Sequence, residues 1–205
     1  MNQINKVLIL LDLHGVLIKT RNTKGLYAKC IYNKDFSYEM FREVYYNQFS
    51  ESISEEELIK ELNKSGAEVK HKISSKLSIR INKQLLSFLF NINNHCDFGI
   101  VSDIDKTRIN AITKLQSDFF DIFKIKYLSC RTGFSKFKNK QKLFDKIKIE
   151  NNHYDKIIYI DDKLEYITYA TNAGFVSIIY KWKIFNTKTI IKSINKLIIK
   201  KKEMQ

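Results

Sequence analysis

Three unbroken apolar runs, each followed directly by a polar residue, constrain the fold of this chain more than any other feature. The runs are Val7–Leu11, Phe98–Val101 and Ile157–Ile160. Runs of this length without alternation are typical of strands that are buried on both faces, as in a parallel sheet covered by helices on each side. The residues that follow them are Asp12, Ser102 and the pair Asp161–Asp162.

The segments between these runs have the spacing of amphipathic helices. Their apolar positions recur every three or four residues, as in Ile109–Leu115, Leu143–Ile147, Leu164–Ala173 and Ile190–Ile198. A fourth apolar run, Val176–Tyr180, has the same buried character as the first three, and Ile125–Leu128 is a weaker strand candidate because Lys126 interrupts it. Strand and helix alternate, so we predict an α/β fold with a doubly wound parallel sheet of the Rossmann-like kind.

One stretch breaks this alternation and predicts an insertion. Residues 20–77 contain no clear buried strand, so we divide the chain into an α/β core of residues 1–19 and 78–205 and an inserted helical cap of residues 20–77. One cap helix has a well-marked start, because Ser54 and Glu57 have the spacing of a capping box. Another helical pattern covers Tyr38–Phe49, whose aromatic residues we expect to pack between cap helices. The insertion follows the first strand, the place of a lid over a site.

The polar residues at the strand ends predict where chemistry takes place. In an open parallel sheet, ligands bind at the carboxyl ends of the strands. A single Asp after a strand often only caps a helix. Three such endings at one edge indicate a site suited to phosphate or metal chemistry.

Four motifs, in order, give the chain a resemblance to the haloacid dehalogenase (HAD) superfamily, which includes many Mg²⁺-dependent phosphatases. They are the strand with its Asp and Gly in Leu8–Leu17, the strand and Ser in Gly99–Asp103, the Gly-x-x-Lys of Gly133–Lys136, and the strand, Asp pair and helix of Ile157–Phe175. Together they span almost the whole chain. The helical insertion between the first two motifs matches the branch of that superfamily with a helical cap in this place.

The resemblance implies a Mg²⁺-dependent hydrolase of a small phosphomonoester that works through a phospho-aspartate. Asp12 would attack phosphorus, and a divalent cation would offset the repulsion between two anions. The metal ligands implied are Asp12, the backbone carbonyl of His14, and Asp161 or Asp162. Phosphate binding would fall to Ser102, Asp103 and Lys136. The sequence leaves open which lysine serves the site, because Lys138 and Lys140 lie close by.

His14 departs from the family pattern. The phosphatases of the superfamily usually have a second Asp there, which protonates the leaving alcohol and activates the attacking water. An imidazole can transfer protons near neutral pH, so His14 can replace it as acid/base. Otherwise the enzyme hydrolyses its phospho-aspartate poorly, or catalysis is lost. The alternative function is therefore a weak or inactive phosphate-binding, regulatory module that binds an acidic partner.

Charge and composition limit the classes of molecule that this chain is expected to bind. The formal net charge of +14 suits phosphorylated ligands and is compatible with nucleic acid, but the lysines are spread over the chain and no nucleic-acid-binding motif is present, so we do not expect that partner. No apolar stretch approaches the ~20 residues that span a bilayer, so we expect a cytoplasmic protein without membrane contact. The three scattered cysteines are expected to be reduced thiols.

Overall fold

The computed structural model describes residues 6–20, 23–47, 53–73 and 77–199. The strands are β1 Val7–Leu11, β2 Ile18–Lys19, β3 Arg80–Ile81, β4 Asp97–Ser102, β5 Ile125–Leu128, β6 Lys156–Asp161 and β7 Val176–Ile179. The helices are α1 Thr23–Cys30, α2 Tyr38–Asn47, α3 Glu55–Lys64, α4 Lys83–Ile92, α5 Lys106–Leu115, α6 Ser129–Thr132, α7 Lys136–Asn139, α8 Gln141–Glu150, α9 Leu164–Asn172 and α10 Thr187–Ile199. No helix in these ranges is long and apolar enough to cross a membrane.

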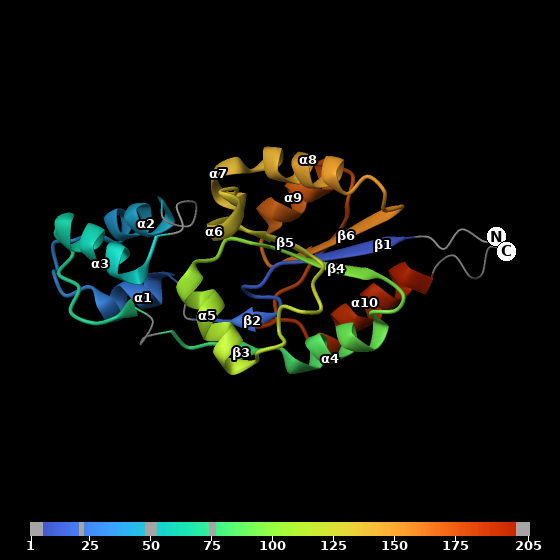
Figure 1. The fold of residues 1–205 in the computed structure, drawn as a ribbon, viewed down its shortest axis with the longest axis horizontal. Coiled ribbons are helices and arrows are strands. Elements are labelled where there is room, and N and C mark those ends of the chain that lie inside the picture. Colours follow the sequence, from blue (N-terminus) through green and yellow to red (C-terminus); the bar gives the residue numbers. More distant parts are fainter. Residues whose placement is uncertain (1–5, 21–22, 48–52, 74–76, 200–205) are drawn as a thin grey trace.

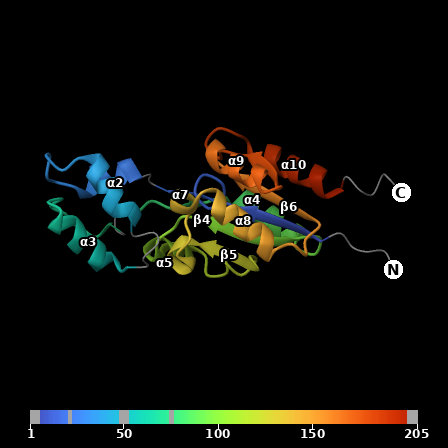
Figure 2. The same ribbon diagram turned by 90° about the horizontal axis from the view of Figure 1, so that it is seen from above.

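The core is a five-stranded parallel sheet in the order β5-β4-β1-β6-β7, with β1 in the middle. Side chains of β1 alternate between two helical layers. Ile9 and Leu11 pack with α4, α5 and α10, whereas Leu8 and Leu10 pack with α8 and α9. The helices therefore cover both faces of the sheet (Figure 1 and Figure 2). This arrangement confirms the predicted doubly wound α/β core, because a strand buried on both sides needs apolar residues at every position.

The two outer strands differ from what their sequence suggested. Val176 and Ile179 of β7 are 38% and 39% exposed, so the prediction that Val176–Tyr180 is buried on both faces is wrong. β7 lies at one edge of the sheet and therefore has a neighbouring strand on one side alone. The weaker candidate Ile125–Leu128 is a strand, β5, at the opposite edge. An edge position tolerates a residue such as Lys126, whose charged end can reach water.

Two residues expected on buried helix faces are exposed instead. Leu115 and Leu164 are 59% and 69% exposed, and each is the terminal residue of its helix. The turns that pack against the sheet lie further inside those helices. In α9 it is Tyr166 and Ala170 that are buried.

The insertion forms a helical body with a hydrophobic cluster of its own, in which Phe41, Tyr45 and Leu62 are buried. Figure 1 shows α1, α2 and α3 at the left, beyond the carboxyl ends of the strands. The antiparallel pair β2–β3 joins the chain entering and leaving it. The predicted capping box of Ser54 and Glu57 is confirmed at the start of α3. Phe49 of the predicted second helix and the basic tail Lys200–Lys202 lie outside the described residues.

Candidate active site

Asp12 and Asp161 lie side by side at the carboxyl edge of the sheet. β1 and β6 are parallel neighbours in which Leu11 pairs with Ile160, so the residue that follows each pair comes to the same edge. The backbone N–H of Asp12 continues the ladder by donating to the carbonyl of Ile160 at 2.9 Å. Both carboxylates are buried. The sheet register thus brings together two acidic residues that are far apart in the sequence.

Lys136 is the lysine that reaches these carboxylates. Its Nζ lies 3.0 Å from Asp12 Oδ1 and donates to Asp161 Oδ2 at 2.7 Å. Burial alone lowers the pKa of Lys136, but the neighbouring carboxylates outweigh it and raise the pKa above its ordinary value, so the ammonium stays charged. Lys138 and Lys140 are exposed. Among the three lysines that the sequence left open, Lys136 alone is buried with the strand-end carboxylates.

Asp103 holds the segment that carries this lysine. Its two carboxylate oxygens accept hydrogen bonds from the backbone N–H of Lys136 at 2.7 Å and of Phe137 at 3.1 Å. These N–H groups belong to the first turn of α7, where backbone donors have no helical partner. Asp103, expected near phosphate, therefore has a visible second use: it fixes the start of α7 so that the Lys136 side chain points at Asp12.

Three carboxylates form a cluster that suits a hard cation. Asp12, Asp161 and Asp162 each offer an oxygen atom, and these atoms lie within 4.8 Å of one another. Asp161 is already engaged, since it accepts from Lys136, from the Tyr159 hydroxyl and from the backbone N–H of Lys163. Burial, followed by the charges of Asp12 and Asp161, raises the pKa of Asp162 to about 6. Oxygen ligands of this kind match Mg²⁺.

Gly15 makes room for the third carboxylate. Its φ is +84°, and a Cβ built on it would lie 2.3 Å from Oδ2 of Asp162. A side chain at this position would therefore clash with a metal-ligand candidate, in a conformation that already disfavours L residues. The glycine directly after His14 is required on both grounds.

Ser102 ends β4, the strand next to β1, and its hydroxyl is an unusual group. The Oγ atom is buried and has no hydrogen-bond partner among the described residues. Buried hydroxyls almost always have a partner, because removing one from water without compensation costs free energy. An anionic ligand at the sheet edge would supply the missing acceptor.

His14 is a neutral imidazole. Its pKa is lowered to about 3, chiefly because burial disfavours the imidazolium and next because the Arg108 guanidinium lies near; Lys136 and Lys163 add to the effect, and Asp105 opposes it. At neutral pH the side chain is therefore a proton acceptor and not an acid. Its ring lines the same cavity as Asp12.

A cavity of about 540 Å³ lies between this sheet edge and the insertion. The core contributes Asp12, His14 and Lys136 to its walls, and α2 of the insertion contributes Arg42 and Tyr46. The Tyr46 ring stacks on Phe137, the neighbour of Lys136, with 5.4 Å between centroids. The insertion thus covers the strand-end carboxylates.

Several residues on these walls were not foreseen from the sequence. They are Lys19, Arg42, Tyr46, Arg108 and Trp182. Arg42 and Tyr46 lie on α2 and the other three come from separate segments. None belongs to one of the four motifs, so the motifs did not point to them. Trp182 reaches the site because its backbone N–H donates to the carbonyl of Gly15 at 2.8 Å, which ties the loop after β7 to the loop after β1.

Comparison with known proteins gives a clear result for the fold. No protein-family model and no curated protein sequence matches the chain. Solved structures do match. A HAD-family enzyme of Bacteroides thetaiotaomicron, in a magnesium complex, has a TM-score of 0.73 at 19% identity and covers 91% of this chain and 98% of its own. A predicted HAD-like hydrolase of Porphyromonas gingivalis has a TM-score of 0.76 at 18% identity, with 96% and 98% covered. This chain has the HAD fold.

The match to HAD structures extends over almost the whole chain. A HAD-superfamily hydrolase of Ehrlichia chaffeensis matches over 96% of this chain and 100% of its own, with a TM-score of 0.54 and 17% identity. The Bacteroides enzyme has also been solved with both magnesium and inorganic phosphate. The resemblance that the four motifs carried is thereby confirmed at the level of the fold.

Proposed function

We propose that this HAD-fold protein is a Mg²⁺-dependent phosphohydrolase that cleaves a small phosphomonoester through a phosphorylated Asp12. The observation that carries the proposal is the buried ion pair of Asp12 and Lys136, 3.0 Å apart, on the wall of the cavity. An aspartate beside a cation at a strand end is an available nucleophile. Structural neighbours that were solved with magnesium and phosphate support the same assignment.

The residues present fit a magnesium ion. Asp12 and Asp162 would hold it, and the backbone carbonyl of His14 is the further ligand that we propose. Asp161 is better suited to fixing Lys136, because both of its oxygens already accept hydrogen bonds. The bound ion would offset the repulsion between the carboxylate of Asp12 and the phosphate.

Each remaining group has a role in the proposed reaction. Asp12 attacks phosphorus, the bond from phosphorus to the ester oxygen of the substrate breaks, and that oxygen takes a proton from water and leaves as the alcohol. Lys136 neutralises charge on the transferred group, and the unpartnered Ser102 hydroxyl donates a hydrogen bond to one of its oxygens. A neutral His14 accepts a proton from the water that then cleaves the phospho-aspartate, which regenerates Asp12.

We infer further that residues 20–77 act as a cap that limits the substrate to a small molecule. Arg42 and Tyr46 of α2 line the cavity, and Tyr46 stacks on Phe137 of the core. A cavity of about 540 Å³ has the size of a small-molecule site. A cavity of this size, lined by both the core and the insertion, supports an enzyme acting on a small phosphorylated compound over a module that binds an acidic macromolecule.

His14 supports a second candidate, a phosphate-binding protein with weak hydrolytic activity. A pKa of about 3 leaves no protonated imidazole to donate to a leaving alcohol at neutral pH. Alkyl phosphates need such a donor, because an alkoxide leaves poorly. This candidate predicts that Asp12 is phosphorylated, or phosphate bound, with slow turnover.

The test is an assay of small phosphomonoesters with and without Mg²⁺ on wild type, Asp12→Asn and His14→Asp. We expect Mg²⁺-dependent turnover that falls by ~10³-fold or more in Asp12→Asn, since the nucleophile is lost. Activity that survives in Asp12→Asn would overturn the mechanism. A silent wild type with an active His14→Asp would instead establish the second candidate.

A further inference from the structure

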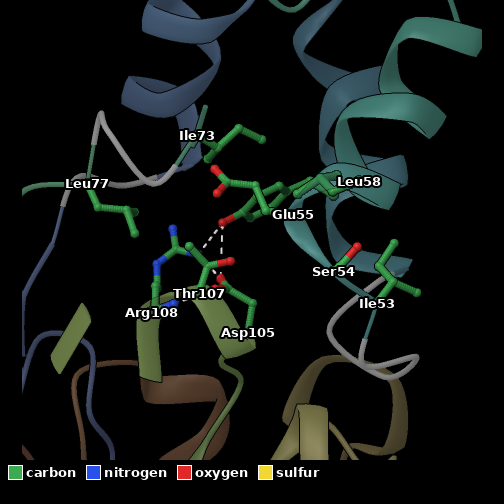
Figure 3. Close-up of a pocket in the computed structure, with 10 residues that line it drawn as sticks. Ile53, Ser54, Glu55, Leu58, Ile73, Leu77, Asp105, Thr107 and Arg108 are labelled. Carbon is green, nitrogen blue, oxygen red and sulfur yellow. Dashed lines mark hydrogen bonds and ion pairs between the residues drawn. The ribbon is translucent and has the colours of Figure 1, made fainter. Parts of the chain in front are cut away.

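Arg108 is a buried cation on the wall of the cavity that the proposed reaction does not use. It lies on α5 of the core and is 4% exposed. One terminal nitrogen, Nη1, donates both to Asp105 and to the hydroxyl of Tyr45 on α2. Figure 3 draws a separate and smaller pocket, where Asp105 and Arg108 of the core lie together next to Ser54, Glu55 and Leu58 of the insertion. Arg108 therefore joins the core to the cap at the cavity.

The guanidinium of Arg108 has donors to spare. Its Nε is buried and has no hydrogen-bond partner in the described part of the chain. A guanidinium has five N–H donors in a planar fork, which matches two oxygens of a carboxylate or phosphate. A purely structural ion pair with Asp105 would leave this buried Nε unsatisfied, which costs free energy.

The rest of the outer wall is also cationic. Outside the sheet-edge carboxylates, the one acidic residue among those lining the cavity is Glu165. No ion pair to a carboxylate joins any of six lining cations within the described ranges. These are Lys19, Arg42, Lys140, Lys163, Lys181 and Lys183.

The positive charge on this wall is greater than one transferred phosphoryl group needs. Lys136 and the proposed magnesium already face that group. Cations arranged around a low-dielectric cavity favour anionic ligands and raise their local concentration. The wall therefore fits a ligand with more negative charge than one phosphate.

Building on the proposed function, we propose that the preferred substrate carries a second anionic group, a carboxylate or a second phosphate, which the Arg108 fork binds. Both groups present two oxygens to a guanidinium in the same way. Asp105 and Tyr45 hold Nη1 and so fix the position of this guanidinium, which belongs to a residue that lines the cavity. Arg108 is thus a specificity-determining residue, whereas Lys136 serves the transferred group.

The test compares three probes that share one phosphoryl group: ethyl phosphate, phosphoglycolate with its added carboxylate, and ethylene glycol bisphosphate with its added phosphate. The measured quantity is kcat/KM with Mg²⁺ for wild type, Arg108→Met and Arg108→Lys. We expect wild type to prefer one of the two probes with a second anionic group over ethyl phosphate by roughly 10- to 100-fold. Arg108→Met should lose that preference, and Arg108→Lys should keep part of it.

Lys114→Met is the matched control, because Lys114 is an exposed cation on the same helix and lines no part of the cavity. It should keep the wild-type preference. Circular dichroism and melting of each variant establish that it is folded. A wild type without preference, or an Arg108→Met that keeps it, would overturn the inference.

A binding measurement separates this inference from the proposed function. Calorimetry with Asp12→Asn and Mg²⁺ compares ethyl phosphate with the two probes that carry a second anionic group, with and without Arg108→Met. Selective binding that depends on Arg108, together with a wild type that turns over none of the probes, would overturn the proposed function and support the inference. Turnover without any selectivity would overturn the inference alone. Absence of both turnover and selective binding would overturn both the proposed function and the inference.

Discussion

The carboxyl edge of the sheet and the boundary between core and insertion each hold a buried cation, but they are assembled differently. At the sheet edge, Lys136 pairs with Asp12 and Asp161, and all three belong to the core. At the boundary, Arg108 pairs with Asp105 of its own helix and with Tyr45 of the insertion. The first arrangement depends on the core alone, through the register of the sheet and the contacts of Asp103 with α7, whereas the second requires the insertion to lie over the core.

The two regions also carry opposite charge. The sheet edge gathers three carboxylates around one lysine, and this surplus of negative charge suits a metal ion. The outer wall of the cavity has the reverse surplus, of cations without carboxylate partners in the described ranges. Under the proposed function, the reacting group and the rest of the substrate would therefore be bound by separate parts of the molecule. Substitutions at matched positions test this separation.

The largest effect is expected from Lys136→Met. Removing the cation leaves Asp12 and Asp161 buried without compensation, which costs about 3–5 kcal/mol of the free energy of unfolding. Added Mg²⁺ should restore more stability to this variant than to wild type, because the ion replaces the missing positive charge. The measurement is denaturant unfolding with and without Mg²⁺. Lys138→Met is the control, because Lys138 is an exposed lysine of the same helix, and its free energy of unfolding should stay within about 0.5 kcal/mol of wild type. Equal stability of the two variants would contradict the conclusion that Lys136 compensates the buried carboxylates.

Gly15→Ala should have the next largest effect. The left-handed conformation costs about 1–2 kcal/mol for a residue with a Cβ, and the clash with Asp162 adds to this cost. Gly66→Ala in the insertion is the control, because its φ is +92° and nothing lies within 4 Å of an added Cβ. Both variants should lose stability, but Gly15→Ala alone should lose Mg²⁺-dependent activity. An active Gly15→Ala would show that Asp162 is free to move.

Tyr45→Phe probes the boundary and should cost less. It removes the hydroxyl that accepts from Arg108 but keeps the ring that stacks on Phe41 at 5.2 Å. We expect a loss of about 1–2 kcal/mol in thermal unfolding, as for a hydrogen bond to a charged group. Tyr38→Phe, on the same helix and without a hydroxyl hydrogen bond among the described residues, should change stability by less than about 0.5 kcal/mol. Equal losses of stability in Tyr45→Phe and Tyr38→Phe would mean that the hydrogen bond from Arg108 to Tyr45 contributes nothing to stability.

Ser102→Ala should have the smallest effect on stability and a clear one on binding. The hydroxyl has no partner in the described chain, so its loss should leave the free energy of unfolding unchanged or slightly higher. Affinity for inorganic phosphate with Mg²⁺ should fall by about 10-fold. Ser129→Ala is the contrasting control, because Ser129 Oγ accepts from the backbone N–H of Ile104 at 3.0 Å, and it should lose stability instead. Unaltered phosphate affinity in Ser102→Ala would remove Ser102 from the site.

The sequence by itself determined the core of this protein. Val7–Leu11 is apolar at every position, and this requires a strand covered on both faces; the structure places it in the middle of the sheet. The polar residues after the central strands therefore had to meet at one edge. Local signals worked as well, since Ser54 and Glu57 form the predicted capping box.

Which of several nearby residues reaches the strand-end carboxylates depends on the folded chain. The Gly-x-x-Lys spacing favoured Lys136 without excluding Lys138 and Lys140, and the hydrogen bonds of Asp103 to the start of α7 place the Lys136 side chain at the carboxylates. The edge positions of β5 and β7 follow from strand order, which local hydrophobicity does not encode. Local patterns also could not predict the pairing of Arg108 with Tyr45, because contacts between distant segments depend on how the whole insertion packs on the core. Patterns in sequence report burial; the partner that a buried charge finds is a property of the folded chain.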